Sequence, residues 1–155
     1  LGKILTINSV YNDFIYVKEW RGGSCDKIQN DKSEEYTYEI REFKTTSSSK
    51  YTNVLDTCRY TKKFIIYEIG DHIDCRYYDR PVYAGSHTFY IDIEDDNYGR
   101  LLEKWFQTPL FSKIYEITKS SQYLKSGFIK HVKLPTSEYT GLENVKEIQK
   151  VFYDL

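Results

Sequence analysis

The chain has 155 residues and a net charge of −1, and 16 of its residues are tyrosine. A chain of this length buries roughly 70% of the surface that its unfolded state exposes, so we expect a single domain over residues 1–155. The near-neutral charge offers no electrostatic attraction for nucleic acid, and no apolar run reaches the roughly 18 residues of a membrane span. Composition therefore excludes a membrane-spanning protein, a collagen, a coiled coil and a basic nucleic-acid-binding arm.

The sequence contains no methionine, although a primary translation product normally begins with one. We therefore expect Leu1 to be an internal residue and the chain to be a domain excised from a larger protein. Cys25, Cys58 and Cys75 are too few and too scattered for a disulfide framework, and an odd number leaves at least one of them unpaired or in an intermolecular bond. We expect isolated thiols in packing roles.

Alternating apolar and polar residues predict short β-strands over the first two-thirds of the chain. The expected strands cover residues 3–7, 13–19, 35–44, 62–69, 72–78 and 86–93. The clearest is 35–44, because Tyr36, Tyr38 and Ile40 fall on one face while Glu35, Thr37, Glu39 and Arg41 fall on the other. Gly70-Asp71 predicts a hairpin, and Arg80-Pro81 is expected to end the strand that follows it.

After Asp96 the apolar spacing becomes helical. A stripe of large apolar side chains leads to Pro109, which suits the first position of a renewed helix with Thr108 as its cap. Residues 127–134 are expected to form a strand, and Thr140 with Glu143 has the spacing of a capping box. The predicted fold is α+β, with a largely antiparallel sheet packed on a central amphipathic helix (about 97–118) and a C-terminal helix (about 141–153).

Metal sites and cofactor sites are not expected. The acidic run from Asp92 to Asp96 lacks the spacing of an EF-hand loop and suits the N-terminus of a helix. His72 and Asp74 would point to one face of a strand while Cys75 points to the other, which does not favour a zinc site.

Catalytic motifs do not point to an enzyme either. The chain has no nucleophile elbow, no P-loop and no dinucleotide-binding glycine motif. A histidine-dependent nuclease would use two imidazoles beside a phosphate. His72, His87 and His131 are available but fall on separate predicted strands, so this activity stays only as a second alternative to a binding function.

The tyrosine excess favours a binding surface. Each buried tyrosine hydroxyl needs a hydrogen-bond partner, so some of these rings are expected at the surface, where they form rigid plates with a polar edge. Sugars suit such plates, because their C–H faces stack on rings while their hydroxyls bond to charged side chains. The expected ligand-binding residues lie in two segments: Trp20, Arg21, Tyr77, Tyr78, Asp79, Arg80 and Tyr83.

In size and composition the whole chain resembles the receptor-binding head of a viral attachment protein, and in particular the outer-capsid spike head of group B-like rotaviruses. The resemblance implies a non-enzymatic domain on the virion surface, released from a larger protease-cleaved spike. The implied partner is a host cell-surface glycan or glycoprotein, with no direct membrane insertion. The first alternative is a secreted viral or parasite immune-evasion domain that binds a protein.

Overall fold

The computed structural model of the chain describes residues 13–20, 28–42, 49–68, 73–118, 128–141 and 143–155. The strands are β1 (Ile15–Val17), β2 (Ile28–Gln29), β3 (Tyr38–Arg41), β4 (Lys50–Thr52), β5 (Thr61–Tyr67), β6 (Asp74–Ala84) and β7 (Thr88–Asp92). The helices are α1 (Asp96–Phe106), α2 (Pro109–Thr118), the 3-10 turn η1 (Ser137–Tyr139) and α4 (Val145–Phe152). Predicted features at residues 3–7, Arg21, Cys25, Gly70-Asp71 and His72 lie outside the described residues.

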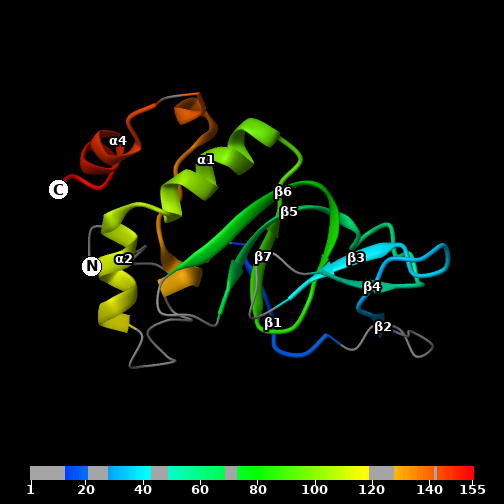
Figure 1. The fold of residues 1–155 in the computed structure, drawn as a ribbon. Coiled ribbons are helices and arrows are strands. Elements are labelled where there is room, and N and C mark those ends of the chain that lie inside the picture. The colour runs from blue at the N-terminus through cyan, green and yellow to red at the C-terminus, as the bar shows by residue number, and fades with distance from the viewer. Residues whose placement is uncertain (1–12, 21–27, 43–48, 69–72, 119–127, 142) are drawn as a thin grey trace.

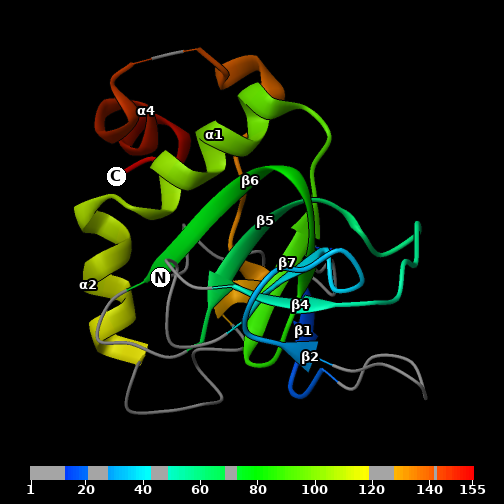
Figure 2. The ribbon, with the colours of Figure 1, turned by 45° about the vertical axis from the view of Figure 1, so that its right-hand side comes forward.

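The fold is α+β, as the sequence predicts. The seven strands form one sheet in the order β1-β7-β5-β6-β3-β4-β2, and every pairing is antiparallel except that of β6 with β3. Figures 1 and 2 show α1, α2 and α4 gathered on one side of the molecule, while β3, β4 and β2 curl away at the other. The sheet therefore has a helix-covered half and a half without a helical layer.

A bend in β6 joins these two halves of the sheet. β6 pairs with β5 from Asp74 to Tyr78. Beyond this point the register shifts, because the two steps from Lys63 to Thr61 on β5 correspond to the four steps from Tyr78 to Val82 on β6. The extra residues form a bulge that contains Arg80 and Pro81, and the strand continues to Ala84 beside β3. The prediction that Arg80-Pro81 ends the strand is wrong, because proline is tolerated at a bulge where no ladder hydrogen bond is needed.

The main hydrophobic core lies between the sheet and the helices. Alternate side chains of β5 and β6, such as Phe64, Cys75 and Tyr77, point into this core and pack against the apolar stripe of α1. Trp105 is fully buried, as its place in that stripe predicts. Its indole nitrogen donates a hydrogen bond to the Tyr153 hydroxyl at 2.9 Å, which ties α1 to the end of α4.

The acidic run 92–96 builds the start of α1. Asp95 is the N-cap, and its carboxylate accepts hydrogen bonds from the backbone amides of Asn97 and Tyr98. Asp96 binds the Lys62 ammonium at 3.1 Å and the Tyr77 hydroxyl at 2.7 Å. The expectation of a helix N-terminus is confirmed.

The helical region over 97–118 consists of α1 and α2, and α2 begins at Pro109, as the sequence predicts. The Thr108 hydroxyl donates to the Trp105 carbonyl at the end of α1. Two predicted local features are corrected. Residues 128–131 are helical, so the predicted strand over 127–134 is wrong; this segment packs its apolar side chains into the helix-covered core. The N-cap of α4 is Asn144, whose side chain accepts from the Glu147 amide, in place of the expected Thr140.

Gly99 sets the distance between α1 and β6, and we predict that Gly99→Ala destabilises the domain. A Cβ atom at this position would lie 2.3 Å from two ring carbons of Tyr77, whose hydroxyl is held by the Ile93 carbonyl at 3.0 Å. Overpacking of this kind costs about 1–3 kcal/mol, which exceeds the gain of about 1 kcal/mol from alanine in a helix.

The measurement is urea denaturation, in which the Gly99→Ala midpoint should fall. Lys104→Ala, an exposed change on the same helix, is the control and should shift the free energy of unfolding by no more than about 0.5 kcal/mol. A Gly99→Ala variant that is more stable than the parent would contradict the close packing of α1 on β6.

Candidate ligand-binding site

The residues for which the sequence predicts ligand binding are not gathered on one surface. Arg21 lies outside the described residues, whereas Asp79 and Arg80 are exposed. The four predicted aromatic plates retain between 2% and 8% of their accessible surface: Trp20, Tyr77, Tyr78 and Tyr83. Their expected surface position is wrong, because each ring packs into one of the apolar clusters of the fold, and a buried ring offers no stacking face to a ligand.

The buried tyrosines keep their hydroxyls satisfied inside the protein. Tyr83 donates to the Val54 carbonyl at 3.0 Å and accepts from the Asp56 amide at 2.6 Å. Tyr78 shares a hydrogen bond of 2.5 Å with Tyr67. Core packing thus accounts for more of the tyrosine excess than the sequence alone indicates, because each buried ring has a partner for its polar end.

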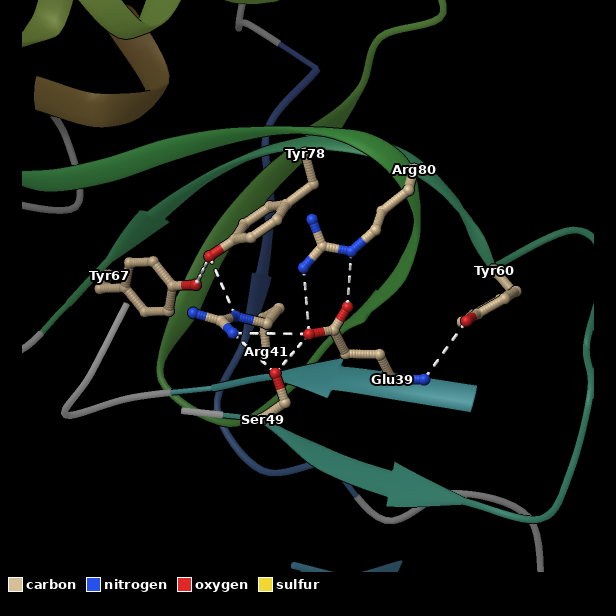
Figure 3. Close-up of polar contacts among 7 residues, drawn as sticks. All are labelled: Glu39, Arg41, Ser49, Tyr60, Tyr67, Tyr78 and Arg80. Carbon is tan, nitrogen blue, oxygen red and sulfur yellow. Dashed lines mark hydrogen bonds and ion pairs between the residues drawn. The ribbon is translucent and has the colours of Figure 1, made fainter. Parts of the chain in front are cut away.

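A buried guanidinium anchors a polar network on the side of the sheet away from α1 (Figure 3). The Arg41 side chain is only 5% exposed, and its Nε donates to the Tyr78 hydroxyl at 3.0 Å. One terminal nitrogen donates to the Ser49 hydroxyl at 2.6 Å and lies 3.5 Å from the Glu39 carboxylate. A buried charge is tolerated only with such partners, so these contacts fix the Arg41 side chain in one position.

Glu39 connects this buried network to the surface. Its carboxylate accepts hydrogen bonds from Arg80 Nε at 2.9 Å and from a terminal nitrogen of Arg80 at 3.2 Å, and it also accepts from Ser49. Burial raises the pKa of Glu39, but the hydrogen bonds from Arg80 and Ser49 and the charges of Arg80 and Arg41 outweigh burial and lower the pKa overall. The Arg80 side chain is 54% exposed, so the two-point contact holds a solvent-facing guanidinium in place.

A hollow of about 330 Å³ opens beside this Arg80–Glu39 pair. It is lined by Lys32, Thr37, Glu39, Tyr51, Tyr60, Arg80 and Pro81. Glu39 and Tyr51 face each other across β3 and β4, and the bulge of β6 brings Arg80 to the same place. Residues that are far apart in the chain thus meet at one polar and aromatic hollow, which we call the β3 hollow.

The Tyr60 ring in the β3 hollow is held on three sides. Its hydroxyl accepts a hydrogen bond from the Glu39 amide at 3.3 Å. Tyr38 packs edge-on at 5.3 Å between ring centroids, and Tyr83 lies at 4.9 Å. A ring fixed in this way loses little conformational entropy when a ligand stacks on it.

The β3 hollow combines hydrogen-bond donors with partly exposed rings. Lys32 and Arg80 supply cationic donors, Thr37 supplies a hydroxyl, and Tyr51 and Tyr60 are each partly exposed. Such a set can orient a polar ligand that also has an apolar face. Among the described residues, no cluster of histidine, cysteine and carboxylate side chains is arranged to hold a metal ion.

Sequence reasoning found Arg80 but missed the other residues of the β3 hollow. The alternation over 35–44 correctly places Thr37, Glu39 and Arg41 on one side of this segment, and Thr37 and Glu39 line the β3 hollow. Glu39 and Arg41 have opposite charges and lie two residues apart on one strand, so their side chains share a face. This spacing is the signal that could have indicated a charged network there.

The His87 side chain is held by Glu68. His87 Nδ1 lies 3.0 Å from a Glu68 carboxylate oxygen, and the Tyr16 hydroxyl donates to the same oxygen at 2.5 Å. Burial, followed by the Glu68 hydrogen bond and charge, raises the pKa of Tyr16 to about 12. Tyr16 therefore remains a neutral donor to Glu68 at physiological pH.

Comparison with protein-family models, with curated proteins and with solved structures finds no match for this chain. No helix within the described ranges is both long enough and apolar enough to cross a membrane.

Glu39 supports both the network and the β3 hollow, and we predict that Glu39→Gln lowers stability at neutral pH by about 2–4 kcal/mol. The variant leaves the Arg41 charge buried without its counter-ion. Because the folded pKa of Glu39 lies below the ordinary value of about 4.3, its carboxylate stabilises the fold above that pH and ceases to do so as pH falls through the folded pKa.

Urea denaturation at pH 7 and at pH 3 measures this effect, and the gap between the parent and Glu39→Gln should narrow at the lower pH. Glu94→Gln, a change at an exposed position, is the control and should leave stability within about 0.5 kcal/mol of the parent at pH 7. A pH-independent gap would show that the Glu39 charge does not stabilise the fold.

Proposed function

We propose that the chain is a non-enzymatic glycan-binding domain of a viral surface spike protein and that the β3 hollow binds the sugar. The observation that carries the proposal is the fixed Tyr60 ring beside the Arg80–Glu39 pair. A sugar ring can lay its C–H face on such a tyrosine while its hydroxyls bond to charged side chains at the edge. Both kinds of group are held in position before any ligand arrives.

The size and lining of the β3 hollow suit a small polar ligand. Its volume of about 330 Å³ lies at the lower end of the range for small-molecule sites. Lys32, Arg80 and Thr37 at its wall can donate hydrogen bonds, and Glu39 can accept one. This balance suits the hydroxyls of a terminal sugar better than it suits an apolar ligand.

The wider context of the proposal rests on the resemblance in size and composition to viral spike heads. The partner is a host cell-surface glycan or glycoprotein, and the domain acts on the virion surface in attachment to the host cell. The remainder of the parent surface protein would display the β3 hollow toward the host.

A protein-binding role, as in immune evasion, is the second candidate. Val54 and Leu55 are 36% and 47% exposed in the connection between β4 and β5. This connection follows Tyr51 of β4 and ends with Tyr60, directly before β5. Apolar side chains beside partly exposed tyrosines are common in protein interfaces. In that case the tyrosines would contact a protein epitope.

A glycan array probed with the purified domain tests the proposed function. The proposal predicts retention of a small related group of glycans that share one terminal sugar. If the domain retains no glycan at high protein loading, the carbohydrate function is wrong, and a partner protein becomes the better explanation.

Arg80 and Arg100 form a matched pair for locating the site. Arg80 is 54% exposed and bonds to Glu39, whereas Arg100 is 53% exposed and bonds to Asp79 at 3.0 Å. We predict that Arg80→Gln weakens binding of the retained glycan at least tenfold, because it removes a fixed charged donor from the β3 hollow. Arg100→Gln should bind like the parent.

Titration calorimetry measures both affinities, and melting temperatures check that each variant is folded. Tyr51→Ala is a second change in the β3 hollow and should also weaken binding without unfolding the domain, because Tyr51 is only partly buried. Equal affinities for Arg80→Gln and Arg100→Gln would place the sugar elsewhere.

A further inference from the structure

The helical layer contains a second hollow, which is separate from the β3 hollow. Figures 1 and 2 show the start of α2 beside the last residues of the chain. The hollow between them has a volume of about 250 Å³. Its walls are Thr108, Pro109, Leu110, Lys113, Lys146, Gln149, Lys150 and Leu155, and we call it the α2–α4 hollow.

Hydrogen bonds hold two of the residues that line the α2–α4 hollow, Gln149 and Leu155. Gln149 is 2% exposed, and its side-chain amide donates to the Trp105 carbonyl at 2.8 Å. The Leu155 amide donates to the Lys150 carbonyl at 2.9 Å, which holds the end of the chain against α4, and Leu155 lines the hollow. Pro109 and Leu110 supply apolar surface from the opposite wall.

Lysine side chains surround this apolar interior. Lys146 and Lys150 share one face of α4, since they are four residues apart, and Lys113 faces them from α2. Lys150 lies 3.5 Å from Glu147, so its charge is partly compensated. Neither Lys113 nor Lys146 makes an ion pair with any residue that the structure describes.

We infer that the α2–α4 hollow binds a free amphiphilic carboxylate with one short hydrocarbon chain. The apolar walls remove the chain from water, and the Lys113 and Lys146 ammonium groups attract the carboxylate at the rim. The volume of about 250 Å³ suits a short hydrocarbon chain, and the open rim leaves the carboxylate in contact with water. This site is independent of the proposed glycan function.

The test uses octanoate as the probe and titration calorimetry as the measurement, on the full 155-residue chain. We expect saturable binding at one site, with affinity rising about fourfold per methylene from butanoate to octanoate. Octanol should bind more weakly, and octylammonium, which has the same chain and the opposite charge, should bind least. Added salt should weaken octanoate binding, because the lysines are at the surface.

Substitutions then locate the site. Lys113→Gln combined with Lys146→Gln should weaken octanoate binding about tenfold, since each exposed ammonium adds a modest attraction for the carboxylate. Lys18→Gln, an exposed change directly after β1, is the matched control and should leave the affinity unchanged. In amide NMR spectra, octanoate should shift the signals of Leu110 and Gln149 and leave that of Tyr60 in place.

The inference would be overturned by no saturable binding of octanoate, by equal binding of octylammonium, or by equal affinity of the parent and the double lysine variant. Shifts at Tyr60 in place of Leu110 would assign the carboxylate to the β3 hollow and would equally overturn it. Failure of glycan binding has no bearing on these outcomes, because the sugar site is tested through Arg80.

Discussion

Both halves of the sheet are joined by a single strand, β6, which bends at its bulge. Before the bend, β6 pairs with β5 and buries Cys75 and Tyr77 under α1. After it, the strand runs parallel to β3 and places Tyr83 against a second, smaller apolar cluster. The bulge between these parts exposes Arg80 above β3, so one irregularity joins the two halves of the sheet and forms the wall of the β3 hollow.

Glu39 contacts both the buried residues of the core and the exposed residues of the β3 hollow. Its carboxylate is shared between buried Arg41, Ser49 and exposed Arg80, and its amide fixes the Tyr60 hydroxyl. Arg41 is in turn hydrogen-bonded to Tyr78 on the inner part of the sheet. A guanidinium and an aromatic ring at the β3 hollow are thus held by groups that are themselves packed, which is the usual requirement for a specific binding site.

The sequence predicts local structure here better than it predicts the site. Periodicity places α1 and β3 correctly, because each has one apolar face and the side-chain spacing reports that face directly. It fails at Pro81, where a bulge keeps the strand going, and at residues 128–131, where tertiary packing selects a helix. It also places Tyr78 and Tyr83 at the surface, because the partners of their hydroxyls come from distant parts of the chain that alternation cannot identify.

In the proposed sugar site, the Arg80–Glu39 pair and Tyr60 are held in position before the ligand binds. Amide and guanidinium NMR spectra recorded during titration with a glycan retained on the array would show whether these groups respond as one site. The Arg80 Nε–H signal and the Glu39 amide signal, whose proton is donated to Tyr60, are expected to shift together and saturate at one affinity. Shifts confined to the helical layer, with both of these signals unmoved, would contradict the proposed sugar site.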